Sequence, residues 1–129
     1  MPLTLLAVFL GGAAGTGMRL AADALIPSEG FVLSTLTVNV VGSFVLALLV
    51  GRAWPRVPEW MRAGLGAGLL GAFTTFSAIA VTVVQLSATG EPIVAAGYLL
   101  ASLALGLAAG VVGLWLGGDR APRIDEVNE

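Results

Sequence analysis

The chain has 129 residues, of which 57% are hydrophobic and only 11% are charged, whereas a soluble domain carries about 25% charge. The absence of cysteine and histidine excludes disulfides, thiolate metal ligands and the commonest general base, and the net charge of −2 argues against a nucleic-acid partner. The 18 glycines favour close helix packing in lipid, so the composition predicts a small integral membrane protein that is not an enzyme.

Four long apolar stretches follow one another along the chain. We expect transmembrane helices near residues 3–25, 31–50, 61–86 and 93–116, because about 20 apolar residues cross a bilayer as a helix. Three short connections and a polar C-terminal tail at 117–129 leave no room for a soluble domain, so residues 1–129 form a single membrane domain. No basic residue precedes the first stretch, which disfavours a cleaved signal peptide.

The first expected span contains the only basic residue that lies away from the end of a span by more than one turn. This residue is Arg19, four positions beyond Gly15. Its guanidinium can extend to the membrane interface or attract anions into a vestibule. The residues by themselves leave both interpretations open.

The second expected span carries a polar face. Thr35, Asn39 and Ser43 recur every fourth residue and therefore share one side of a helix. The amide of Asn39 offers two donors, which suit either an anion or a neighbouring helix. Both alternatives stay open at this point.

The third expected span has three hydroxyl residues near its midpoint, in the segment Gly71-Ala-Phe-Thr-Thr-Phe-Ser77. A glycine followed by such a cluster predicts a helix break, which is tolerated at that depth only inside protein or beside water. Carbonyls released by a break can coordinate a hard cation. Residues 66–71 also match the dinucleotide motif G-x-G-x-x-G, but a membrane span lacks the strand that this motif requires.

The fourth expected span has a small and partly polar stripe, which suits a packed interface or a narrow pathway. Its members recur at four-residue spacing and are Tyr98, Ser102, Gly106 and Gly110.

The arginines indicate the orientation of the chain. With four spans, the N-terminus, the middle connection and the C-terminal tail lie on one side of the membrane. That side carries five arginines, namely Arg52, Arg56, Arg62, Arg120 and Arg123, and the opposite connections carry none. The positive-inside rule therefore predicts a multi-pass protein of the cell membrane with both termini in the cytoplasm.

Several motifs resemble those of the Fluc (CrcB-type) fluoride channel family. The glycine-rich segment 11–19, which ends in Arg19, resembles the opening of the family's first helix, and Asn39-Val-Val-Gly-Ser-Phe44 resembles its second-helix motif. The segment 71–77 resembles its third-helix signature, G-x-x-T-T-F-S. Tyr98 and Ser102 match its fourth helix. The resemblance covers nearly the whole chain.

The resemblance implies an all-α membrane protein with a broken third helix, assembled as an antiparallel dimer in lipid. Members of the family conduct fluoride passively out of the cytoplasm and hold a structural Na⁺ ion that is not transported. By position, the carbonyls of Gly71 and Thr74 would bind this sodium. The fluoride pathway would be lined by Asn39, Phe76, Thr75, Ser102 and Tyr98, with Arg19 at a vestibule or interface.

Three positions depart from the family pattern. Ile79 stands where a second phenylalanine is expected, Thr82 where a glutamate is frequent, and Gly106 where a hydroxyl is expected. These departures raise the alternative of a partner-dependent or non-conducting subunit. The arginine bias favours pairing with a homologous subunit of opposite orientation, and a homodimer stays open beside this heterodimer. A small multidrug-resistance-type exporter is disfavoured, because such exporters use a central glutamate and Asp23 lies near the end of its span.

Overall fold

The computed structural model describes residues 1–26 and 31–118, with only the backbone described for residues 31 and 32. Within these ranges every regular element is helical, which confirms the all-α prediction. The first two elements are α1 (Pro2–Leu25) and α2 (Phe31–Arg52), and a 3₁₀ turn at Trp54–Arg56 follows them. The polar tail beyond residue 118 lies outside the described residues, and Arg120 and Arg123 lie there with it.

The third expected span consists of four consecutive pieces. They are α3 (Glu59–Ala63), a π-helical stretch at Gly64–Leu70, α4 (Gly71–Phe73) and α5 (Phe76–Ala88). The last helix, α6 (Pro92–Gly117), ends at a left-handed glycine, Gly118 (φ 72°), a conformation that closes helices at little steric cost.

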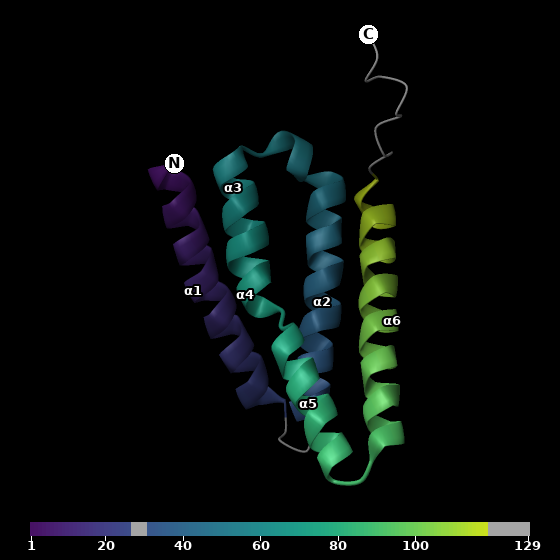
Figure 1. Cartoon of the computed structure of the whole chain (residues 1–129). Helices are drawn as coiled ribbons and strands as arrows, with labels where there is room; N and C mark the ends of the chain where they lie inside the picture. Colours follow the sequence, from purple (N-terminus) through teal and green to yellow (C-terminus); the bar gives the residue numbers. More distant parts are fainter. Residues whose placement is uncertain (27–30, 119–129) are drawn as a thin grey trace.

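The described residues contain four helical segments that are long and apolar enough to cross a membrane, so the chain is a multi-pass membrane protein. They are Pro2–Leu25, Leu33–Arg52, Glu59–Ala88 and Pro92–Gly117. Successive segments run in opposite directions, so the start of α1, the α2–α3 connection and the end of α6 lie on one side (Figure 1).

Apolar side chains cover the outside of the bundle, and its interior contains several buried polar side chains together with Leu70, Phe73 and Ile79. Phe9, Leu107 and Trp115 are all more than 70% exposed, whereas Ser34, Thr35 and Val38 are almost completely buried. This distribution is the reverse of that in a soluble protein, and it is stable when the exterior contacts lipid.

Helix α1 packs closely against the third span through glycine. A β-carbon added to Gly15 would lie 2.1 Å from the carbonyl oxygen of Leu69 and 3.1 Å from the amide nitrogen of Phe73. Such contacts bring backbone directly against backbone, as small residues allow between membrane helices. Gly15 therefore places α1 beside the residues that precede the α4–α5 junction.

Two residues with extended backbone separate α4 from α5. Thr74 has φ −82° and ψ 155°, and Thr75 has φ −151° and ψ 123°. Oγ1 of Thr75 then accepts the N–H of Ala78 at 3.3 Å and so caps the start of α5. The junction is visible in Figure 1 as the short link between α4 and α5.

Candidate functional site

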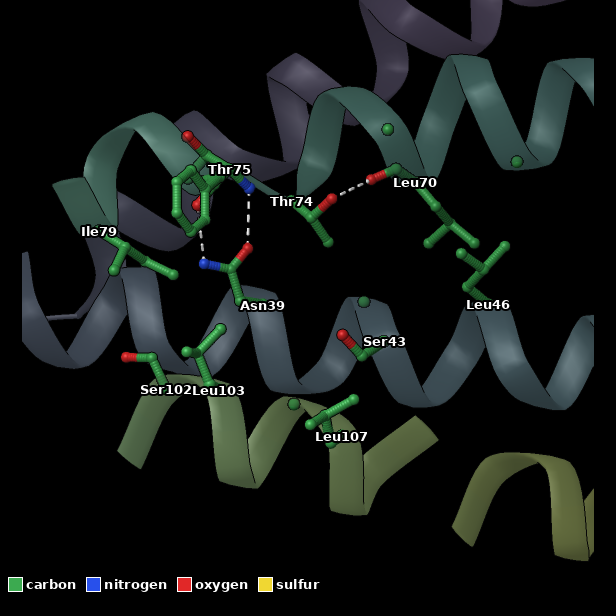
Figure 2. Close-up of a pocket in the computed structure, with 15 residues that line it drawn as sticks. Asn39, Ser43, Leu46, Leu70, Thr74, Thr75, Ile79, Ser102, Leu103 and Leu107 are labelled. Atoms are coloured by element: carbon green, nitrogen blue, oxygen red, sulfur yellow. Dashed lines mark hydrogen bonds between the residues drawn. The ribbon is translucent and has the colours of Figure 1, made fainter. Parts of the chain in front are cut away.

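A pocket of about 400 Å³ lies beside this junction, between α2, the third span and α6 (Figure 2). Polar groups and glycines line one part of it, and aliphatic side chains line the rest. Its lining comprises Asn39, Gly42, Ser43, Leu46, Gly66, Leu70, Gly71, Thr74, Thr75, Phe76, Ile79, Ser102, Leu103, Gly106 and Leu107.

The side chain of Asn39 binds the backbone of Thr75 in both directions. Its Nδ2 donates to the Thr75 carbonyl at 2.9 Å, and its Oδ1 accepts the Thr75 N–H at 2.7 Å, as the two dashed lines in Figure 2 show. The amide oxygen thus gives the Thr75 N–H the partner that it would have had in a continuous helix, and the amide nitrogen adds a donor to the Thr75 carbonyl. Because a carboxamide carries two N–H groups, one more donor remains on Nδ2 beyond the bond to Thr75.

The bonds at Thr75 remove the helical hydrogen-bond donors of two backbone carbonyls. In a continuous helix the N–H of Thr75 would bond to the carbonyl of Gly71, but here it donates to Asn39. The N–H of Ala78 would bond to the carbonyl of Thr74, but here it donates to Oγ1 of Thr75. The carbonyls of Gly71 and Thr74 therefore each lose the donor that a helix would supply.

Side-chain metal ligands are not clustered in the described part of the chain. Within residues 1–26 and 31–118, no group of three or more His, Cys, Asp or Glu side chains could hold a metal ion. Backbone and hydroxyl oxygens, which are the ligands that hard cations prefer, are present at the junction.

The hydroxyl groups of Thr74, Thr75 and Ser102 are hydrogen-bonded to the protein. Ser102 donates to the carbonyl of Tyr98 at 2.8 Å, and Thr74 donates to the carbonyl of Leu70 at 2.9 Å. Oγ1 of Thr75 and Oγ of Ser77 lie 3.0 Å apart, and either can be the donor. A hydroxyl that donates to an ion would have to turn away from its present acceptor.

The residues that depart from the family pattern occupy different places. Ile79 is buried and lines the pocket. Gly106 also lines the pocket. Thr82 is buried, and its hydroxyl donates to the carbonyl of Ala78 at 2.9 Å. Phe76 also lines the pocket, and it is 67% exposed.

Two residues named from the sequence lie apart from the pocket lining. Tyr98 is buried one turn before Ser102 on α6. Nε of Arg19 lies 4.0 Å from a carboxylate oxygen of Asp23, one turn further along α1.

The second oxygen of Asp23 accepts a hydrogen bond from Ser34, at 2.5 Å. Sequence reasoning missed this link between α1 and α2, although the spacing of Arg19 and Asp23 was a signal for the ion pair.

An amide and several hydroxyls around a pocket at the non-helical junction of a transmembrane segment define a small helical membrane protein equipped to handle a polar solute or ion. Residues 6–114 match the family model described as "CrcB-like protein, Camphor Resistance (CrcB)". The chain therefore belongs to the CrcB family.

Curated relatives resemble the chain over most of its length. The "Fluoride-specific ion channel FluC" of Paracoccus denitrificans (strain Pd 1222) is 41% identical over 121 residues, which cover 91% of this chain and 96% of the relative. The protein of the same name from Idiomarina loihiensis is 44% identical over 106 residues, covering 79% and 82%. "Fluoride-specific ion channel FluC 1" of Leifsonia xyli subsp. xyli is 40% identical over 124 residues, covering 91% and 88%.

Replacing Asn39 by aspartate tests the importance of the paired bonds to Thr75. Asn39→Asp keeps the shape of the side chain but turns a carboxylate oxygen toward the Thr75 carbonyl. We expect the free energy of unfolding to fall by roughly 1–3 kcal/mol, because one hydrogen bond is lost and a carboxylate oxygen then faces the carbonyl oxygen of Thr75. Tryptophan fluorescence during denaturant titration of the detergent-solubilised protein measures this change.

Ser43→Ala is the matched control, since Ser43 lines the same pocket one turn away on α2. We expect it to change stability by less than about 0.5 kcal/mol. Equal losses in the two variants would contradict a special role for the Asn39–Thr75 pair.

Proposed function

We propose that this chain is a subunit of a fluoride-selective channel that lets cytoplasmic fluoride leave the cell by passive conduction. The relatives named as fluoride-specific ion channels support the proposal, because the matches extend over most of both chains. The observation in the structure that carries it is the amide of Asn39, held in place by Thr75 at the wall of the pocket. These relatives favour neither a non-conducting subunit nor a multidrug exporter.

The pocket residues suit a small and strongly hydrated anion. A pore for such an ion must replace water with donors without holding the ion too tightly. The remaining N–H of Asn39 supplies a rigid donor, and the electropositive ring edge of Phe76 supplies a weak one. Thr75 and Ser102 contribute hydroxyls, with Tyr98 next to Ser102 on α6. The aliphatic remainder of the lining gives the ion no competing charge, so it can leave again.

Fluoride efflux from proteoliposomes tests the channel. We expect proteoliposomes that contain the wild-type chain in its conducting dimer to release fluoride. Phe76→Ile should slow this efflux roughly tenfold, which corresponds to about 1.4 kcal/mol. The reason is that an alkyl side chain has no electropositive edge. A fluoride electrode measures the efflux.

Phe9→Ile is the matched control, because Phe9 is 72% exposed on α1 and does not line the pocket. It should leave the efflux unchanged. A wild-type dimer that releases chloride as fast as fluoride, or releases neither, would contradict the proposed function.

We infer that the third span acts as a broken helix whose carbonyls hold a structural Na⁺ ion. The support is that the helical donors of the Gly71 and Thr74 carbonyls are bonded to Asn39 and to the Thr75 hydroxyl instead. A bound sodium ion would supply positive charge to these oxygens and join the two subunits of a dimer at their junctions. It would not be transported.

Sodium binding predicts a higher thermal midpoint in Na⁺ than in N-methylglucamine at equal ionic strength. At 100 times the dissociation constant the gain is about 2.7 kcal/mol, since the ion binds the folded state alone. Thr74→Val should lower stability by the same amount in both salts and keep the sodium effect, because the carbonyl is unchanged. Identical midpoints in the two salts would contradict the site.

The partner that we propose is a homologous subunit of opposite orientation in the same lipid bilayer, giving an antiparallel dimer. The described arginines of the α2–α3 connection support a fixed orientation with cytoplasmic termini, because Arg52, Arg56 and Arg62 lie on one side of the membrane. The exposure of Phe76 and Gly71 beside the junction also fits a surface that a second subunit covers.

Reconstitution separates a homologous partner from a second copy of the chain. We expect at least tenfold more fluoride efflux per dimer for protein purified from cells that co-express a homologue with the reverse arginine bias, because a chain that the cell inserts in one orientation cannot form an antiparallel pair alone. Full efflux from the chain alone would contradict the homologous partner and would leave the channel itself in place.

A further inference from the structure

The carboxylate of Asp23 connects two helices and faces an opposite charge. Ser34 on α2 donates to its Oδ1 at 2.5 Å, and Nε of Arg19 on α1 lies 4.0 Å from its Oδ2. Ser34 is only 2% exposed, so the carboxylate is fixed by a buried group. The side chains of Arg19 and Asp23 are 29% and 31% exposed, which leaves both partly hydrated.

The Arg19–Asp23 pair lies close to the wall of the pocket along the helix axes. Ser34 precedes Asn39 by five residues, which corresponds to about 7.5 Å of helix rise. On α1, Arg19 follows Gly15 by one turn, and Gly15 contacts Leu69 and Phe73 just before the α4–α5 junction. This axial separation of Ser34 and Asn39 is comparable to the Debye length of about 10 Å at 0.1 M salt, so salt screens the charges of Arg19 and Asp23 only partly over this stretch of α2.

The ion pair is more important for the local potential than for stability. Its nitrogen–oxygen distance of 4.0 Å is long, and partly exposed pairs of this kind stabilise proteins little. A lone arginine at the end of an anion pathway would raise the local anion concentration, as charged clefts do. An adjacent carboxylate offsets much of that charge.

We propose that Asp23 is a positioning residue that sets the anion-attracting potential at one end of the fluoride pathway by offsetting and orienting Arg19. This inference rests on the proposed channel function. Ser34 holds the carboxylate in place, so the offset is constant rather than intermittent. The pair limits how strongly this end of the pathway concentrates anions.

Fluoride efflux at two ionic strengths tests the inference. At about 0.01 M the Debye length is about 30 Å, and at about 0.5 M it is shorter than the distance to Asn39. With sodium held constant, we expect Asp23→Asn to raise efflux roughly threefold at low ionic strength and to match wild type at high ionic strength. Asparagine can still accept the hydrogen bond from Ser34, so the helix link is preserved.

Three further variants separate charge from structure. Arg19→Gln should lower efflux at low ionic strength only, and it gives an independent test should Asp23→Asn fail to fold. Ser34→Ala keeps both charges but releases the carboxylate, so it should raise efflux at low ionic strength by less than Asp23→Asn does. Glu91→Gln removes an exposed carboxylate on the same side of the membrane, next to the start of α6, and should have little effect.

The outcomes distinguish the inference from the function on which it rests. An increase with Asp23→Asn that persists at high ionic strength, or that Glu91→Gln reproduces, would overturn the role of Asp23. Unchanged efflux in both Asp23→Asn and Arg19→Gln would overturn it as well. Absence of fluoride efflux from the wild-type dimer would instead contradict the channel function itself.

Discussion

The pairing of the Asn39 side chain with both backbone groups of Thr75 is the interaction on which the site depends. Extended residues inside a membrane span are costly, because lipid cannot satisfy their N–H and carbonyl groups. Asn39 on α2 supplies hydrogen-bond partners to both backbone groups of Thr75, and α5 begins directly after the Thr75 cap. The position of α2 against the third span therefore determines whether the junction can exist.

Packing through glycine makes that arrangement possible. At Gly42, an added β-carbon would meet the methyl group of Thr74 at 2.2 Å, so α2 reaches the junction only because this position lacks a side chain. Gly15 brings α1 equally close on the other side. Backbone contact and polar pairs thus replace the hydrophobic driving force that is absent between helices in lipid.

The structure changes how the polar residues named from the sequence are understood. Asn39 was open to two interpretations, an ion donor or a bond between helices, and its amide is able to serve both because it has two N–H groups. Ser102 and Thr74 have their hydroxyls directed to carbonyls of their own helices, a local competition that residue type alone does not reveal. Tyr98 shares a helix stripe with Ser102 but is not part of the pocket lining.

The sequence by itself determined the membrane class, the four spans and the family resemblance, because these follow from apolar length, charge distribution and short contiguous motifs. It also directed attention to residues 71–77, where glycine and hydroxyls gather at mid-span. Only the tertiary structure decided that Asn39 binds Thr75 and that Ser34 holds the carboxylate of Asp23. Those contacts join residues on different helices, and their geometry depends on how closely the glycines let the helices approach. No local pattern in the chain specifies that distance.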